Sequence, residues 1–98
     1  MINEIYLALK DMGECPTASA FSREYLGMES NYFRGLKWRD RRASSRALAN
    51  CASVLREKGE LLSHSEAPVI VERREKLRKM SEDCIEVLLG SFQENMQP

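Results

Sequence analysis

The sequence has 98 residues, of which 15 are basic and 15 acidic, so its formal net charge is zero. A chain of this length is expected to form one domain, residues 1–98, with a modest core. There is no run of 18 apolar residues, which excludes a transmembrane segment. The N-terminal residues lack the basic start and continuous apolar stretch of a signal peptide. These features predict a cytoplasmic protein without a membrane partner.

Apolar residues recur at spacings of three and four along most of the chain, which predicts helices. Sustained alternation of apolar and polar residues is absent, and the only β-branched cluster is VIV at 69–71. Strands are therefore not expected. The predicted fold is all-α, a small five-helix domain. In chain order, the expected helices span residues 2–12, 18–26, 30–37, 45–57 and 68–94.

Several residues are suited to the ends of these helices. Thr17, and Ser44 or Ser45, can cap the helices that follow them, because a hydroxyl oxygen accepts a hydrogen bond from a free amide of the first turn. Gly59 is expected to end the fourth helix. Pro68 fits the first turn of the fifth, where its missing N–H does no harm. The residues expected to share one core are Phe21, Leu26, Phe33, Leu36, Leu48, Cys51 and Leu55.

The zero net charge hides an uneven distribution. Residues 1–30 and residues 59–98 each carry a net charge of −3, whereas residues 31–58 carry +6. Six basic side chains fall within residues 34–46, against the single Asp40. This concentration of positive charge indicates an anionic partner and says little about the fold.

The cysteines do not form a recognisable binding pattern. Cys15, Cys51 and Cys84 are odd in number and far apart, without a CxxC pair. A disulfide framework or a zinc site is not expected, because the only histidine, His64, has no cysteine beside it. Cys51 and Cys84 fall at apolar helix positions and are interpreted as small buried hydrophobic side chains. We expect no metal and no cofactor.

Residues 17–58 have the order helix, short turn with glycine, helix, basic loop, helix. The pair Leu26-Gly27, the segment SNYFRGLK at 30–37 and the segment LANCASVL at 48–55 resemble the helix-turn-helix of lambda-repressor-like transcriptional regulators. In that family a short turn joins the first helix to a recognition helix. Here the turn is expected to contain only three residues, GME at 27–29.

The sequence departs from the pattern of that family in two places. The small residue expected four positions before Gly27 is Arg23, and the nearest small residue is Ser22, so the first helix of the motif has one extra residue. Gly35 lies inside the next helix and weakens it by about 1 kcal/mol relative to Ala. The same stretch is also similar to small bacterial helical proteins with an FSxxxLG…SYF core, a resemblance that adds no activity.

The repressor resemblance implies that the helix at 30–37 enters the major groove of DNA. Asn31 would read adenine and Arg34 guanine through paired hydrogen bonds. Tyr32 would contact a phosphate or a thymine methyl group, or it would fill the edge of the core instead. The residues expected to contact bases or phosphates are Ser30, Asn31, Tyr32, Arg34, Lys37, Arg39, Arg41, Arg42 and Arg46.

The fifth predicted helix is long and has a narrow apolar stripe. Charges of opposite sign recur three and four residues apart along its middle, as on a solvated helix face. Such a helix can pack on its own domain or pair with a second copy. The second alternative predicts a homodimer. Its interface would contain Ile70, Leu77, Met80, Cys84, Val87 and Leu88.

Motifs of enzyme active sites are absent: the sequence has no nucleophile elbow, glycine-rich phosphate loop or HExxH. We therefore expect no catalytic residues, and two functions remain open. One is a dimeric transcriptional regulator that binds double-stranded DNA through the helix at 30–37 and the basic loop after it. The other is a small protein-interaction module, of the antiactivator or inhibitor type, that binds a protein partner. The basic segment favours the first, and the zero total charge favours the second.

Overall fold

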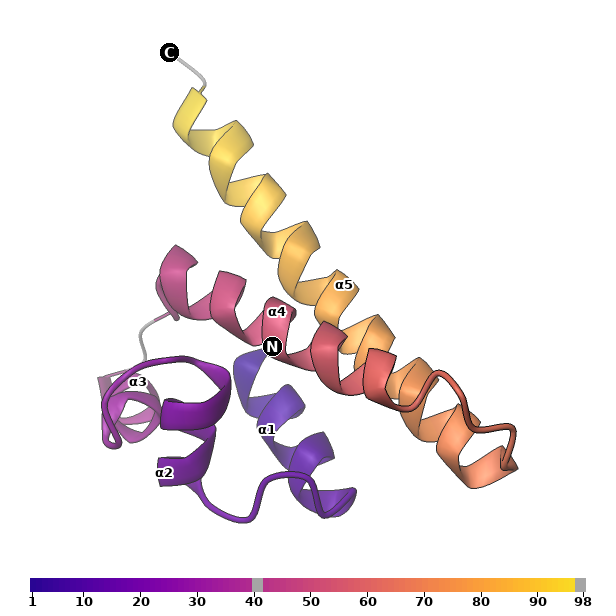
Figure 1. Cartoon of the computed structure of the whole chain (residues 1–98). Coiled ribbons are helices and arrows are strands. Elements are labelled where there is room, and N and C mark those ends of the chain that lie inside the picture. Colours follow the sequence, from indigo (N-terminus) through magenta and orange to yellow (C-terminus); the bar gives the residue numbers. More distant parts are fainter. Residues whose placement is uncertain (40–41, 97–98) are drawn as a thin grey trace.

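A computed structural model of the protein describes residues 1–39 and 42–96, and the side chains of residues 1–37 and 42–90. This part of the chain is helical and has no strand (Figure 1). Its elements are α1 (Ile2–Asp11), α2 (Ala18–Ala20), the π-helical segment η1 (Phe21–Tyr25), α3 (Tyr32–Arg39), α4 (Ser45–Leu61) and α5 (Pro68–Met96). Because α2 runs directly into η1, these described elements amount to five helices, and the predicted all-α fold is confirmed.

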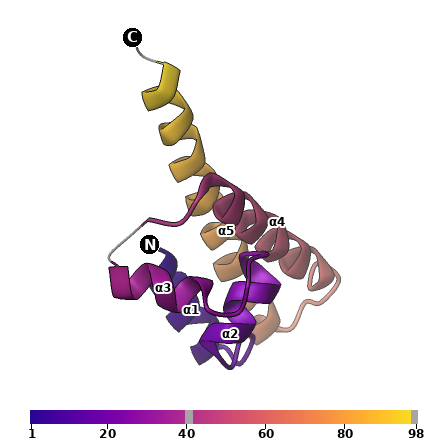
Figure 2. The same cartoon turned by 90° about the vertical axis from the view of Figure 1, so that its left-hand side faces the viewer.

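The helices α4 and α5 form an antiparallel hairpin that makes the most extensive helix–helix contact in the described structure. The shorter elements α1, α2, η1 and α3 pack on one side of α4, and the C-terminal part of α5 projects beyond the body (Figures 1 and 2). The radius of gyration over Cα atoms is 14.0 Å, against the ~12.6 Å expected for a compact domain of this length. The projecting helix accounts for this elongation.

Two predicted helix caps are confirmed. The Thr17 hydroxyl oxygen accepts a hydrogen bond from the Ala20 amide at 3.1 Å. The Ser44 hydroxyl oxygen accepts one from the Ala47 amide at 3.2 Å. Each bond satisfies an amide that would otherwise lack a partner inside its helix.

The prediction that Gly59 ends the fourth helix is wrong, since α4 continues to Leu61. Gly59 is buried inside the helix, where a Cβ atom would lie 3.8 Å from the Arg74 carbonyl oxygen and 3.9 Å from the Leu77 Cβ. The glycine therefore marks the place where α5 passes close to α4. Packing against α5 outweighs the cost of about 1 kcal/mol that glycine adds to a helix.

The extra residue of the first motif helix is accommodated by the π-helical turn of η1. The Leu26 amide donates to the Phe21 carbonyl oxygen, five residues earlier, at 3.1 Å. A π turn holds one residue more than an α turn between bonded groups. As a result Ser22 faces the core and is fully buried, while Arg23 points into solvent. The departure seen in the sequence thus has a local structural solution.

The turn between η1 and α3 is longer than the three residues expected. It begins with Gly27 in the left-handed region, at φ +64°, and the Met28 amide closes it on the Ser22 carbonyl oxygen at 2.9 Å. A second turn follows, in which the Tyr32 amide donates to the Glu29 carbonyl oxygen at 3.0 Å. This second turn moves the start of α3 from the expected residue 30 to Tyr32.

The core lies between the α4–α5 hairpin and the aromatic side chains of α1, η1 and α3. The rings of Tyr6, Phe21 and Phe33 are in mutual contact, with centroids 4.9–5.4 Å apart. Of the predicted core, only Leu36 is not buried; it is partly exposed because it faces a surface groove. The buried members of the predicted core are Phe21, Leu26, Phe33, Leu48, Cys51 and Leu55.

The three cysteines are free thiols inside the core, so the interpretation of Cys51 and Cys84 as buried hydrophobic side chains is confirmed, and Cys15 is buried as well. Burial raises the pKa of the Cys15 thiol above its ordinary value. The thiol of Cys51 interacts with Cys84 across the α4–α5 contact, and this interaction together with burial raises the pKa of Cys51. Both Cys15 and Cys51 therefore remain protonated near neutral pH.

Candidate nucleic-acid interface

The helix α3 is attached to its neighbours by two side-chain hydrogen bonds near its start. The buried Ser22 hydroxyl oxygen of η1 accepts a bond from the Phe33 amide at 3.0 Å. The Tyr32 hydroxyl oxygen accepts one from the Ser44 amide at 2.9 Å, directly before α4. With the Phe33 ring buried as well, the orientation of α3 relative to η1 and α4 is set by its first two residues.

The opposite side of α3 faces solvent. Asn31, Arg34 and Lys37 follow one another at intervals of three residues, so they share one face of the helix, and all three side chains are exposed. Figure 2 looks onto α3, which lies in front of α1 at one end of the molecule. This polar face combines an amide with two cations, which are side chains that can read base edges in the major groove.

The sequence predicted that Ser30 and Asn31 lie in the first turn of the helix. In the structure both lie in the turn before α3. The Asn31 carbonyl oxygen accepts a bond from the Gly35 amide at 2.9 Å, which places Asn31 immediately before the helix. Ser30 is half-buried, whereas Asn31 is exposed. Of these two predicted contact residues, only Asn31 therefore has an exposed side chain, at the N-terminal end of the helix.

Tyr32 fills the edge of the core, the structural one of the two roles considered for it. Its side chain is half-buried and packs against the core, and its hydroxyl oxygen holds the amide of Ser44. Tyr32 therefore joins α3 to α4.

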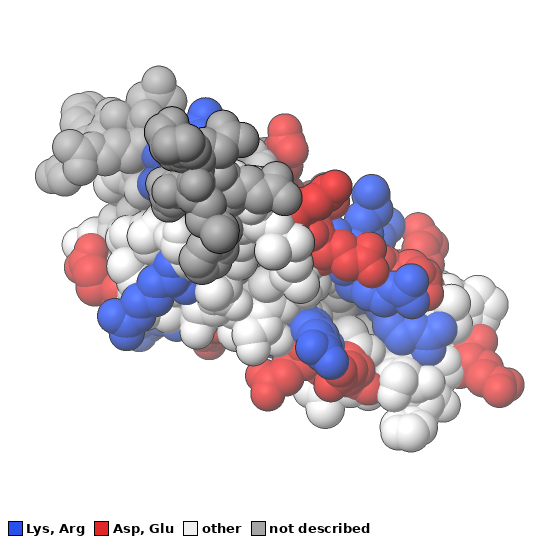
Figure 3. Space-filling view, turned by 90° about the horizontal axis from the view of Figure 1, so that it is seen from above, with Lys and Arg blue, Asp and Glu red and all other residues white. Residues whose placement is uncertain are grey.

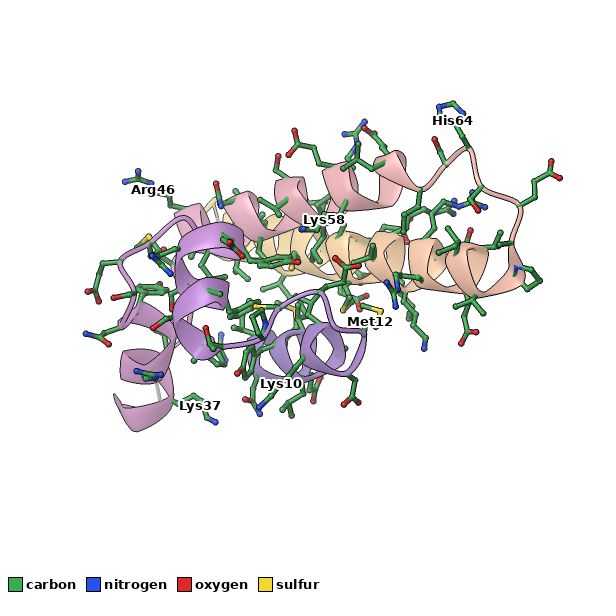
Figure 4. The ribbon with its side chains drawn as sticks, turned by 60° about the horizontal axis from the view of Figure 1, so that its bottom comes forward. Lys10, Met12, Lys37, Arg46, Lys58 and His64 are labelled. Carbon is green, nitrogen blue, oxygen red and sulfur yellow. The ribbon has the colours of Figure 1, made fainter. Side chains whose placement is uncertain are left out.

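The remaining predicted cations lie in and after α3. Arg42 and Arg46 are exposed, whereas the side chain of Arg39 and the whole of Arg41 lie outside the described residues. Figure 4 shows Lys37 and Arg46 at the same end of the molecule, with Arg46 at the upper left and Lys37 at the lower left of the view. These cations do not converge on a single point. They line one end of the molecule, an arrangement suited to an extended polyanion and not to a small anion.

The ion pairs of the described structure lie elsewhere. They are formed by basic side chains of α4 and α5, and Figure 3 shows blue and red side chains interleaved over the end of the molecule where these two helices meet. The basic residues in these pairs are Arg56, Lys58, Arg73, Lys76 and Arg78. Among described residues, Arg34, Lys37, Arg42 and Arg46 have no such pair, so their charge is available to an external partner.

A groove of about 530 Å³ borders this basic end. Its lining includes one residue of α5, Val87, and two cations, Lys37 and Arg42. No carboxylate is present among the lining residues that the structure describes. The apolar lining comes mainly from the start of α1 and from α3 and α4: Met1, Ile2, Phe33, Leu36, Ala43 and Leu48. Sequence reasoning missed the groove, because its walls come from segments far apart in the chain.

The dimer interface predicted along α5 is wrong at two of its six positions. Leu77 and Cys84 are fully buried in the core of their own chain, so they are not accessible to a second copy. The reason is the α4–α5 hairpin, which covers this face of the helix. Ile70, Met80 and Leu88 are partly buried. Val87 is 41% exposed, and its neighbours Ile85 and Leu89 are 42% and 57% exposed.

Other site types find little support in the residues described. His64 is exposed in the connection between α4 and α5, at the opposite end of the molecule from Lys37 and Arg46 (Figure 4). The described side chains form no cluster of three potential metal ligands. Within residues 1–39 and 42–96, every helix is too short or too polar to cross a bilayer.

Comparisons with known proteins place the chain in a family but do not supply a function. A search of curated proteins gives no match, and a search of solved structures also gives none. A family match, by contrast, extends over nearly the whole sequence, residues 2–97. The chain therefore belongs to DUF6626, which is described as a family of unknown function.

Proposed function

We propose that the protein binds double-stranded DNA, with the exposed face of α3 in the major groove. Asn31 and Arg34 contact base edges, and the cations that follow neutralise phosphates. The proposal makes the protein a transcriptional regulator of the helix-turn-helix type, in line with the resemblance of residues 17–58 to that family. Helices are the elements that the major groove accommodates, and their first turns reach the bases.

The observation that carries the proposal is the contrast between the two sides of α3. The inner side is held by the buried Phe33 ring and by the bond from the Phe33 amide to Ser22. The outer side presents Asn31, Arg34 and Lys37 to solvent. A helix that is firmly attached on one side and polar and basic on the other can enter a groove without losing its own packing.

The distribution of charge supports the same reading. Five basic side chains of α4 and α5 are paired with carboxylates, namely Arg56, Lys58, Arg73, Lys76 and Arg78, whereas the described cations of α3 and of the start of α4 have no carboxylate partner within the described residues. Binding of these cations to phosphates releases counterions from DNA, which favours association.

A gel-shift titration with a random-sequence DNA duplex at about 50 mM salt tests the proposal, because electrostatic binding is strong at this ionic strength. We expect a retarded complex with random DNA. If neither random nor genomic DNA gives a complex, the regulator proposal is overturned. In that case the basic end would instead serve the interaction module, and reversal of the same cations to Glu should abolish binding to an acidic protein partner.

A further inference from the structure

The projecting part of α5 has exposed apolar side chains, and the groove beside it has an apolar lining with two cations. In one chain Ile85, Val87 and Leu89 are each more than 40% exposed on this part of the helix. Large apolar side chains gathered in this way on a helix that stands clear of the body indicate a missing partner. We propose that the partner is a second copy of the chain, whose α5 lies in the groove while the first copy's α5 lies in the groove of the second.

The positions of the apolar residues around α5 match this reciprocal arrangement. Val87 lines the groove of its own chain. Ile85 and Leu89 are each two residues away, or ~200° around the helix, so they occupy the opposite side. A helix lying in the groove has α5 on one side and α3 with the start of α1 on the other, because Val87, Phe33 and Met1 are all among the lining residues. Both sides of the inserted helix therefore need apolar residues.

Two copies related by a two-fold axis can place apolar residues on both sides of each inserted α5, and no other surface of the protein is needed. With the two α5 helices antiparallel, Val87 of one copy meets Val87 of the other. Ile85 and Leu89 then face the wall of the groove that contains Phe33 and Leu36. Such an interface is isologous, because the same patch is used on both copies, and it closes as a dimer without growing into a filament.

Charge complementarity favours α5 of a second copy as the occupant of the groove. The described lining of the groove contains Lys37 and Arg42 and no carboxylate. The projecting helix carries Glu86 next to Ile85, and this glutamate is exposed. Opposite charges at the rim of an interface fix its register and speed its formation. Arg34 and Arg46 do not line the groove, so dimerisation leaves them accessible to DNA, whereas Lys37 and Arg42 border both surfaces. The inference does not rest on the proposed function.

Measurement of the mass in solution tests the inference without DNA. At high micromolar concentration, light scattering should give twice the 11.3 kDa of one chain. The double variant Ile85→Glu with Leu89→Glu should raise the dimer dissociation constant roughly tenfold or more. Both residues are exposed, so the fold should be retained. The control is Val69→Glu, which changes an even more exposed apolar residue at the other end of α5 and should leave the mass unchanged.

Two further variants test the register. Arg42→Glu and Glu86→Arg should each weaken the dimer, and a mixture of both should recover it as a heterodimer. In Val87→Cys, diamide should remove two protons and two electrons from the two new thiols and link the copies through a disulfide, whereas Val69→Cys should remain unlinked. A monomeric mass at high micromolar concentration would overturn the proposal. A mass that grows beyond the dimer, or equal cross-linking at both positions, would overturn the two-fold arrangement.

Discussion

The Ser22 hydroxyl oxygen accepts a hydrogen bond from the Phe33 amide at 3.0 Å and donates one to the Ala18 carbonyl oxygen at 3.0 Å. One buried side chain thus joins the helical segment before the turn to the helix after it. Ser22 reaches this position only because the π turn of η1 holds one additional residue. The bond therefore connects an irregularity in the sequence to the placement of the proposed DNA-binding helix.

Removal of this hydroxyl should destabilise the protein. In Ser22→Ala the Phe33 amide remains buried without an acceptor, which costs about 1–3 kcal/mol in the free energy of unfolding. Urea unfolding followed by circular dichroism measures the change. Ser53→Ala, on the exposed side of α4, is the control and should shift stability by less than about 0.5 kcal/mol. Equal stability of the two variants would show that the bond has no importance for the fold.

Gly27 should tolerate substitution less well than Gly13, although both have positive φ angles. Alanine in the left-handed region costs about 1–2 kcal/mol at either position. At Gly27 the new Cβ would also lie 2.8 Å from the Asn50 amide nitrogen, which donates to the Tyr25 carbonyl oxygen at 2.9 Å. A Cβ added at Gly13 would have no atom of the described structure within 4 Å, apart from the glycine and its two chain neighbours. Gly27→Ala should therefore lower the unfolding free energy more than Gly13→Ala.

The additional cost at Gly27 should depend on Asn50. In an Asn50→Ala background, Gly27→Ala should cost no more than Gly13→Ala, because the colliding group has been removed. A double-mutant cycle in urea measures this coupling. An additional cost that persists without Asn50 would mean that another contact limits the size of residue 27.

The free energy of unfolding should fall at alkaline pH, because the Cys15 thiol and the Tyr25 hydroxyl have higher pKa values in the folded state than in the unfolded state. Burial raises the pKa of the Cys15 thiol above 9.0 and that of the Tyr25 hydroxyl above 10.0, their ordinary values. Below about pH 8 both groups are protonated in the folded and unfolded states, so they give stability no pH dependence. Above it the unfolded chain loses these protons first, and the folded state loses stability as pH rises.

Urea unfolding between about pH 8 and about pH 11 measures this loss, over the range where the reference groups titrate. Tyr25→Phe should reduce the decrease of the unfolding free energy with pH above about pH 10, since one ionising group has been removed. Its stability near neutral pH should be slightly lower, because the hydroxyl donates to the Glu14 carbonyl oxygen at 3.4 Å. Stability that rises with pH across this range would contradict the assignment.

Two arginines of the basic end should affect DNA binding in different ways. Arg34→Ala should relax the preference among DNA sequences, with a loss of about 1–3 kcal/mol for a good base contact. Arg46→Ala should weaken binding to all sequences equally, because it removes a phosphate contact. Competition titrations with specific and random duplexes separate these effects. Arg56→Ala is the control: it removes the same charge from an exposed site that pairs with Glu60, and it should change neither quantity.

Much of the fold could be predicted from local signals. The caps Thr17 and Ser44 and the core residues from Phe21 to Leu55 follow from hydroxyl chemistry and helical spacing, which operate within one or two turns. The course of α4 through Gly59 could not be predicted in this way. It depends on α5, which passes close to the glycine from a distant part of the chain.

The candidate site was predictable in its residue types but not in its geometry. The concentration of cations at 34–46 is visible in the sequence, and so is the spacing that exposes Arg34 and Lys37. The start of α3 at Tyr32 depends on two successive turns, and no local signal fixed their combined length. The predicted dimer stripe failed at Leu77 and Cys84 because the same apolar spacing serves a helix that packs on its own domain.

The salt dependence of DNA affinity tests the central claim most directly. Fluorescence anisotropy with a labelled random duplex gives the affinity at about 50 mM and about 200 mM salt. If about four cations contact phosphates, the log–log slope should be roughly −3 to −4, which means a loss of affinity of roughly 100-fold over this range. Arg46→Ala should reduce the steepness by about one unit. Absence of binding at the lower salt concentration, or an affinity independent of salt, would contradict the account.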